Sequence, residues 1–511
     1  MPTEIKANNK LIARNTLFLY VRMLIVLLIS LYTTRVLLRV LGVEDYGVYN
    51  VVSGFVTMFA FLNTAMANGI QRFYNFNLGK YGEKGLTVTY NCALRIQLLL
   101  AIVVFILVEG IGVWYINNIM VLPAGRVMAA NIIFQFSTVS MLLVILQAPY
   151  SGAIMAMERM DYYAVVGIID VILKLGFIFA IQSITFDKLI AWGAICLLIG
   201  IINFLLYFIY CKKRFKFLYI SKQYDKKGFK SMLGFSGWNM FGTFANMMKN
   251  QGLNMVLNLF YGPVVNAARG VAFQISTALE GFVSNNNVAV RPQLTHSFAQ
   301  GNVKRTIQLM FSISKLNYLL LLVMAIPISF EIDFILQIWL DSKVPEHTAS
   351  FTILVLAINL VHNWRSPVSL VVHATGVMRN YQLWMGIINL LTLPIAYLLL
   401  KFGWIPESAF VVCLALDVIG LGVGILILKT LVTFSVWEYL GKVILPCLVV
   451  TLIASVLTYV LRLVMPSGWL GFVLVIIIGF LVCITSSFFI GLSKEEKKMA
   501  KEMLIKFIKK I

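Results

Sequence analysis

Long apolar stretches alternate with short polar ones along almost the whole chain of 511 residues. A helix needs about 20 mostly apolar residues to cross a bilayer, and a window of that length predicts fourteen membrane-spanning segments. Their approximate limits are residues 15–41, 47–70, 91–114, 127–150, 164–184, 189–210, 233–260, 264–290, 306–330, 349–373, 381–400, 407–429, 441–464 and 469–490. The pattern therefore predicts an all-α polytopic membrane protein with 14 transmembrane helices. Composition agrees, since charged residues make up 12% of the chain against about 25% in soluble proteins.

Two neighbouring segments, 233–260 and 264–290, break the apolar pattern. They are joined by a tight turn and carry many asparagines as well as Lys249 and Arg269. An ionised side chain at the bilayer centre costs at least roughly 2.5–3.5 kcal/mol on insertion scales, so these helices cannot face lipid on all sides. They are expected to line a water-filled cavity, where two isolated cations indicate a site for an anion. The alternative is that both cations snorkel to the membrane surface or pair with Glu280.

The net charge of +21 is explained by topology. With the N-terminus placed in the cytoplasm, 29 of the 42 Lys and Arg residues fall in inner segments, 6 at outer ends and loops, and 7 within spans. The positive-inside rule expects this asymmetry, so both termini are predicted to be cytoplasmic. The basic residues then face anionic lipid. A nucleic-acid-binding function is disfavoured because no soluble basic domain exists to host it.

Landmarks of the first half recur in the second half at a nearly constant displacement along the chain. The pairs are Gly42 and Gly262, Arg72 and Arg291, Gly82 and Gly301, and Pro149 and Pro367. A nearly constant displacement indicates a duplicated unit of six spans. Because six is an even number, the two lobes are expected to be related by a pseudo-twofold axis along the membrane normal, around a central cavity.

The duplication predicts five parts. They are an N-terminal lobe (1–210), a basic cytoplasmic linker (211–232), a C-terminal lobe (233–429), two extra spans (430–490) and an amphipathic helix on the cytoplasmic surface (491–511). The last part opens with the capping-box pattern Ser-x-x-Glu and places apolar side chains on one side of a Lys-rich helix, as is typical of a segment that lies on the inner leaflet.

The chain contains no GxxxxGK[ST] motif, no Ser-His-Asp arrangement and no cluster of metal ligands. No enzymatic activity, cofactor or metal is therefore expected, and transport has to draw on ion gradients, membrane potential or the substrate gradient. The six cysteines lack CxxC spacing and are interpreted as small apolar packing residues.

Intramembrane cations outnumber intramembrane carboxylates, which favours an anionic cargo. In a low-dielectric cavity, fixed cations interact strongly with phosphate, and Arg adds a bidentate fork. The substrate-binding candidates are Arg22, Lys249, Arg269, Lys315 and Arg365. The carboxylates Asp170, Glu280 and Asp417 are the candidates for ion coupling.

Two of the remaining intramembrane groups have alternative interpretations. Asp170 and Lys174 lie four residues apart on one helical face, so they form either a structural ion pair or a proton or ion site. His362 is either a proton carrier or a hydrogen-bonded structural residue.

The chain resembles a known group, the polysaccharide transporter branch of the multidrug/oligosaccharidyl-lipid/polysaccharide exporter superfamily, and especially Wzx-type O-antigen flippases. The resemblance rests on Asn15-Thr16 leading into a span with Arg22, on the turn Leu41-Gly42-x-x-Asp45-Tyr46-Gly47, on the inner loop with Arg159 and on the layout of twelve plus two spans.

This resemblance implies a function in lipopolysaccharide O-antigen or capsule biosynthesis. Family members move undecaprenyl-diphosphate-linked oligosaccharide repeat units across the bacterial inner membrane by alternating access. In this family and in the similar lipid II flippases, cavity arginines of spans 1 and 8 engage the diphosphate, and the matching positions are Arg22 and Arg269. Spans 13 and 14 would form a groove for the lipid tail. The implied partners are the lipid-linked glycan, membrane lipids and the polysaccharide polymerase machinery, with the chain acting as a monomer.

Two other functions are weighed against this one. An ion-coupled multidrug antiporter of the same superfamily would use Asp170 or Asp417 for coupling. A membrane glycan polymerase or ligase normally needs a long outer catalytic loop, and the longest here is only 330–350.

Overall fold

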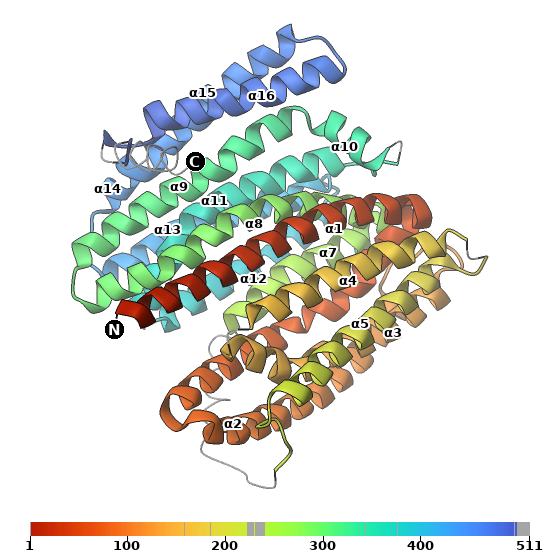
Figure 1. Ribbon diagram of the computed structural model, residues 1–511. Helices are drawn as coiled ribbons and strands as arrows, with labels where there is room; N and C mark the ends of the chain where they lie inside the picture. The colour runs from red at the N-terminus through yellow and green to blue at the C-terminus, as the bar shows by residue number, and fades with distance from the viewer. Residues whose placement is uncertain are drawn as a thin grey trace. The chain divides into compact units, whose positions relative to one another are not determined.

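Helices account for all regular structure in the described residues of the computed structural model (Figure 1). These residues are 2–157, 159–183, 185–221, 229, 241–341, 343–375, 377–494 and 496–497. The elements in chain order are α1 (Pro2–Met58), α2 (Ala60–Asn118), α3 (Val127–Ala156), α4 (Met160–Ile181), α5 (Lys188–Arg214), η1 (Met248–Gly252), α7 (Leu253–Tyr261), α8 (Pro263–Ala299), α9 (Val303–Phe330), α10 (Ile332–Leu340), α11 (Thr348–Thr375), α12 (Arg379–Lys401), α13 (Glu407–Leu431), α14 (Val436–Tyr439), η2 (Leu440–Ile444), α15 (Leu445–Val464), α16 (Trp469–Ser486) and η3 (Ser487–Gly491). To within a few residues, every predicted span lies on helix wherever the structure describes it.

Ten stretches of the described chain are long and apolar enough to cross a bilayer, and the chain is a multi-pass integral membrane protein. One of them, Arg22–Met58, covers most of the predicted span 15–41 and the first part of the predicted span 47–70. The predicted spans at 233–260, 264–290 and 349–373 are helical in their described residues but are not among these ten. They contain buried amides such as Asn266 and Asn363, both 0% exposed. Their low hydropathy therefore reflects polar side chains that are buried within the protein.

The predicted turns at Gly42 and Gly262 share one unusual backbone conformation. Gly42 has φ +80° and ψ +171°, and Gly262 has φ +71° and ψ −169°. Residues with a side chain are strained in this region. Pro149 and Pro367, another pair of landmarks, both lie buried inside long helices, α3 and α11. In these two pairs, the equivalent residues of the repeat therefore share a structural setting.

The landmarks Gly82 and Gly301 are not equivalent. Gly301 has φ +74° in the turn between α8 and α9, whereas Gly82 lies among the helical residues of α2. The chain nevertheless reverses direction near Gly82, because Asn77 Nδ2 donates to Thr89 Oγ1 at 2.6 Å, whereas a straight helix would separate these residues by about 18 Å. The inner turn between the predicted spans 47–70 and 91–114 is therefore present, and its residues are helical. The side chains of Arg72 and Arg291 lie outside the described part of the chain.

Packing divides the chain into two compact units. The first unit comprises residues 1–270 and 396–402, and the second comprises 271–395 and 403–511. The predicted lobes have different limits, and they stay a prediction.

One cluster of the first unit, rich in aromatic residues, packs the middle of α2 against the C-terminal ends of α3 and α5. Beyond α5, Phe215 is buried in this cluster. Asn91 of α2 fixes the chain that follows, since its Nδ2 donates to the carbonyl of Tyr219 at 3.0 Å and its Oδ1 accepts from the backbone N–H of Ser221 at 2.9 Å. The start of the predicted linker 211–232 is therefore packed onto this unit, while most of its later residues lie outside the described chain.

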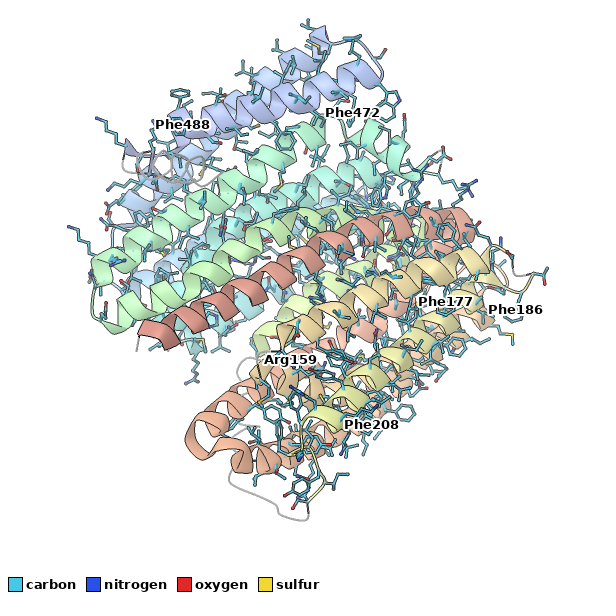
Figure 2. The ribbon with its side chains drawn as sticks, viewed as in Figure 1. Arg159, Phe177, Phe186, Phe208, Phe472 and Phe488 are labelled. Carbon is cyan, nitrogen blue, oxygen red and sulfur yellow. The ribbon has the colours of Figure 1, made fainter. Side chains whose placement is uncertain are left out.

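In the second unit, α15 and α16 cover the two predicted extra spans and pack against α9. Gly479 of α16 lies against Pro327 of α9. Phe472 and Phe488 mark the two ends of the helix formed by α16 and η3 (Figure 2). Large apolar side chains such as Leu463, which is 68% exposed, remain on the surface of this pair, as expected of helices in contact with lipid.

The predicted capping box closes the start of the C-terminal segment. The backbone N–H of Ser493 donates to Glu496 Oε2 at 2.8 Å, and the N–H of Glu496 donates to Ser493 Oγ at 3.3 Å. This reciprocal pair is the arrangement that the sequence predicts. The rest of the predicted surface helix, from residue 498 onward, lies outside the described residues.

Candidate functional site

The hairpin of η1, α7 and α8 contains an interlocked set of buried amides in the first unit. Asn266 Nδ2 donates to the main-chain and side-chain oxygens of Asn254, both at 2.7 Å, and Asn258 Nδ2 donates to Asn266 Oδ1 at 3.0 Å. Asn258 also bonds the N–H and the carbonyl of Val121. Buried amides are retained where their hydrogen bonds are made internally. These asparagines therefore hold the hairpin together.

Two cations lie in the same hairpin. Lys249, in the π-helix η1, is 7% exposed, and Arg269 of α8 is 5% exposed. Arg269 Nη2 donates to the carbonyl oxygen of Asn250 at 2.5 Å. This bond brings Arg269 against the turn that carries Lys249. Single π-helical turns often occur at functional sites, and this one places the two predicted cations on facing helices in the interior of the protein.

Arg22, the third predicted cation of the first unit, packs against α4. Its guanidinium carbon lies 4.6 Å from the centroid of the Tyr163 ring. A Cβ atom at Gly167 would come within 2.3 Å of Arg22 Nε. Tyr163 and Gly167 lie one helical turn apart, so they share the face of α4 on which the guanidinium rests.

The two predicted cations of the second unit are engaged in ion pairs. Lys315 is 6% exposed, and its Nζ lies 2.6 Å from Glu496 Oε2. Burial alone would raise the pKa of Glu496, but Lys315 and the capping hydrogen bonds hold it below its ordinary value. Arg365 Nη1 lies 3.1 Å from Asp417 Oδ1, and its Nη2 lies 3.2 Å from His362 Nδ1. A candidate for substrate binding and a candidate for ion coupling thus contact each other directly.

The other two ion-coupling candidates have different partners. Asp170 accepts from Lys174 at 2.7 Å and from Asn203 of α5 at 2.7 Å. The predicted pairing of Asp170 with Lys174 is confirmed, whatever its role. Glu280 accepts from the amide of Asn363 at 3.0 Å, so its contact is with a neutral group.

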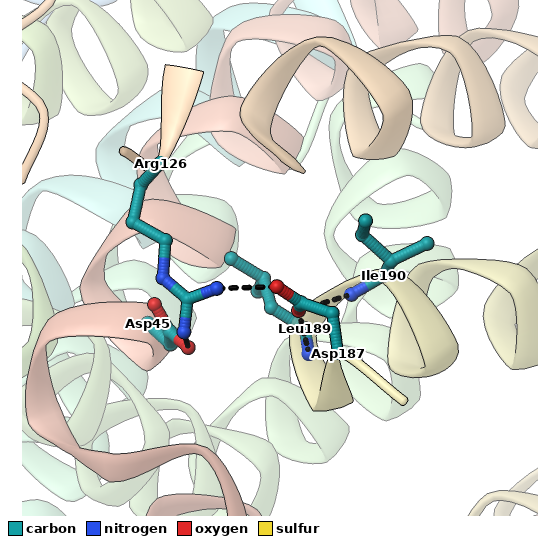
Figure 3. Close-up of polar contacts among 5 residues, drawn as sticks. All are labelled: Asp45, Arg126, Asp187, Leu189 and Ile190. Carbon is teal, nitrogen blue, oxygen red and sulfur yellow. Dashed lines mark hydrogen bonds and ion pairs between the residues drawn. The ribbon is translucent and has the colours of Figure 1, made fainter. Parts of the chain in front are cut away.

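An ionic bridge that the sequence did not predict ties three elements of the first unit together (Figure 3). Arg126, just before α3, lies 2.5 Å from Asp45 and also pairs with Asp187. Asp187 is the N-cap of α5, where its Oδ1 accepts from the N–H groups of Leu189 and Ile190 at 2.9 and 3.2 Å. The bridge therefore joins the α1 turn to the starts of α3 and α5.

The second unit has a counterpart of this bridge. His347 Nδ1, just before α11, lies 2.6 Å from Glu407 Oε1, at the start of α13. Asp187 and Glu407 are as far apart along the chain as Gly42 and Gly262, so they occupy equivalent positions of the repeat. The same displacement matches Arg126 with Glu346 and not with His347, so it would have found the two acidic partners but not the cation of the second pair.

The inner-loop residue Arg159 is held in place by its neighbours. Its Nε and Nη2 each donate to a carboxylate oxygen of Asp161 at 3.0 Å, and its guanidinium lies 5.8 Å from the ring of Tyr210. Tyr210 in turn stacks on Tyr162 with ring centroids 3.7 Å apart. Figure 2 labels Arg159 and, near it, Phe208, which packs against the aromatic cluster of the first unit.

The described part of the chain contains no candidate metal site, since no three His, Cys, Asp or Glu side chains lie close enough there to bind one ion. Five of the six cysteines are buried, as packing residues would be.

Comparison of the fold with solved structures finds transporters. The lipid II flippase MurJ in an inward closed conformation superimposes with a TM-score of 0.73 and 16% sequence identity, over 92% of this chain and 98% of that one. An inward-facing multidrug resistance transporter of the MATE family and the MOP superfamily gives a TM-score of 0.63 at 13% identity, over 79% of this chain and 95% of that one. A MOP superfamily transporter from Pyrococcus furiosus gives 0.56 at 14% identity, over 81% and 95%. No protein-family model and no curated protein matches the sequence. The chain therefore has the fold of these transporters.

Proposed function

We propose that this protein is a flippase for undecaprenyl-diphosphate-linked oligosaccharides in a bacterial inner membrane, with both termini in the cytoplasm. It would supply repeat units for surface polysaccharide by alternating access. The observation that carries the proposal is the burial of Lys249 and Arg269, 7% and 5% exposed, in a hairpin whose asparagines bond to one another.

The chemistry of a diphosphate fits these cations. A diphosphate ester is an anion at neutral pH, and buried opposite charges attract far more strongly than they do in water. Arg269 and Arg22 offer planar forks that match phosphate oxygens, whereas Lys249 acts as a point charge. The glycan crosses through the wet interior while the prenyl tail stays in lipid, beside α15 and α16.

Lys315 and Arg365 also belong to the proposed site, as cations that exchange a carboxylate partner for the diphosphate. Each is paired with a carboxylate, Glu496 at 2.6 Å and Asp417 at 3.1 Å. A buried cation that loses its carboxylate is destabilised, so a diphosphate would replace that partner when the transporter changes state. The likeness to a structure described as a lipid II flippase supports a lipid-linked cargo.

The test is replacement of Arg269 by Ala in a strain whose chromosomal copy is deleted. We expect surface glycan to disappear and the lipid-linked oligosaccharide to accumulate, while the protein is expressed at the normal level. Lys442→Ala is the matched control, because it removes a cation from an exposed pair with Glu438. Normal surface glycan in the Arg269→Ala strain would remove this residue from the mechanism.

The second candidate is an ion-coupled multidrug antiporter, which the likeness to MATE transporters favours. Glu280 would then be a natural coupling group, since it accepts a hydrogen bond from the neutral amide of Asn363. Efflux of organic cations by the purified protein, lost in Glu280→Gln, would support this function over the flippase.

A further inference from the structure

Arg22 rests in a slot on α4 made by Tyr163 and Gly167. The aromatic ring lies 4.6 Å from the guanidinium carbon, within the distance at which cations bind ring faces. The backbone of Gly167 lies so close that an added Cβ would come 2.3 Å from Nε and 3.0 Å from Cζ and Nη2. A contact below 3.0 Å is not tolerated between these atoms, so the slot exists only because residue 167 has no side chain.

The slot holds the guanidinium mainly through its faces. Arg22 Nε is buried, and no acceptor among the described residues bonds to it. This differs from Arg365, whose nitrogens face Asp417 and His362. A guanidinium that is held by a ring and a backbone keeps in-plane N–H donors for an anion.

We infer that Gly167 and Tyr163 are positioning residues that aim Arg22 at the diphosphate of the cargo. This inference rests on the proposed function, of which Arg22 is one binding residue. Neither positioning residue contacts the cargo itself. They fix a long side chain that would otherwise lose considerable rotamer freedom on binding an anion.

The substitution Gly167→Ala tests the slot directly. The atom that must move is the far end of a flexible side chain, so the helix is retained and Arg22 is displaced. Gly176 lies in the same helix with no atom within 4 Å of an added Cβ, which makes Gly176→Ala the matched control. Both changes favour helix, so a loss seen only at position 167 cannot come from a change in helix propensity, and equal melting temperatures of the two variants show that the fold is retained.

The measurement is the Kd of undecaprenyl diphosphate for the purified full-length protein, by native mass spectrometry. We expect Gly167→Ala to weaken binding by about ten- to a hundredfold, as for loss of a charged hydrogen bond, and to match Arg22→Ala. Gly176→Ala should bind like the wild type, and Tyr163→Leu should also weaken binding. In an Arg22→Lys background, adding Gly167→Ala should change nothing further, because the slim lysine has no guanidinium to displace.

The outcomes separate the two proposals. Wild-type binding by Gly167→Ala, together with weak binding by Arg22→Ala, would overturn the positioning role. Wild-type binding by Arg22→Ala would overturn it as well, yet the flippase would stand if Arg269→Ala lost binding. Wild-type binding by Arg22→Ala, Lys249→Ala and Arg269→Ala alike would refute the proposed diphosphate site itself.

Discussion

Gly42 and Gly262, equivalent positions of the sequence repeat, turn the chain with nearly the same φ and ψ, +80° and +171° against +71° and −169°. This region is open to glycine and costly for any residue with a Cβ. The same glycine turn therefore joins two helical segments in each copy of the repeat. The shared backbone conformation supports the predicted duplication more strongly than the sequence identity of the two glycines does.

The first prediction concerns this turn. Gly42→Ala meets no atom within 4 Å, so its cost is backbone strain alone, about 1–2 kcal/mol. Gly110→Ala, in open space inside α2, should instead stabilise the protein by up to about 1 kcal/mol. Thermal unfolding of the purified variants in detergent measures both. Equal melting temperatures would contradict the assigned conformation of Gly42.

Hydrophobic patterning was sufficient to predict the helical architecture, because a bilayer forces apolar runs of fixed length. Near Gly82 it placed the chain reversal correctly, since Asn77 Nδ2 donates to Thr89 Oγ1 at 2.6 Å, but it did not predict that the residues of this turn are helical. Loops and polar helices of similar composition differ only in contacts that the local sequence does not specify.

The candidate site, too, could be predicted from the sequence only in part. Buried cations such as Arg269 could be predicted because a charge inside an apolar helix demands an explanation. Their partners could not, since Lys315 lies in α9 and its partner Glu496 comes only after η3, near the end of the chain. The slot under Arg22 depends on a glycine, Gly167, which no sequence motif marks.

The second prediction concerns the bridge of Figure 3. Arg126→Met leaves the carboxylates of Asp45 and Asp187 without their shared cation. Because Arg126 is 33% exposed, the expected loss is modest, about 1–2 kcal/mol. Asp187→Asn should cost less than Asp187→Ala, since Asn still caps α5. Thermal unfolding of the three variants checks this order, and equal stability of Asn and Ala at position 187 would contradict the capping role.

The third prediction is a pH dependence of the contact between Glu496 and Lys315. The pKa of Glu496 is lowered in the folded protein, relative to about 4.3 for an unperturbed Glu. A lowered pKa means that the ionised carboxylate stabilises the folded state above about pH 4.3, and that this contribution is lost as the pH falls through the folded pKa below it. We expect Glu496→Gln to lower the melting temperature at pH 7 and to have a smaller effect at pH 3.

The matched control for this contact is Glu438→Gln, which removes one partner of an exposed pair with Lys442. Exposed pairs contribute about 0–1 kcal/mol, so its melting temperature should follow the wild type at both values of pH. A Glu496→Gln deficit that stayed constant between pH 7 and pH 3 would show that the carboxylate charge is not what anchors this segment.

The fourth prediction separates structural from coupling carboxylates in the second unit. Asp417→Asn leaves Arg365 buried, with 11% of its side chain exposed, and without its carboxylate, so we expect a loss of about 3–5 kcal/mol. Glu280→Gln keeps a side chain that can still accept from Asn363, so stability should change by less than about 1 kcal/mol. If Glu280 couples transport to an ion, this variant folds normally yet loses the response of transport to an imposed ion gradient.

Measuring melting temperature and gradient-driven transport in proteoliposomes on the same preparations distinguishes the two roles. The reverse result, with Asp417→Asn stable and uncoupled, would move the coupling site to the Arg365 pair.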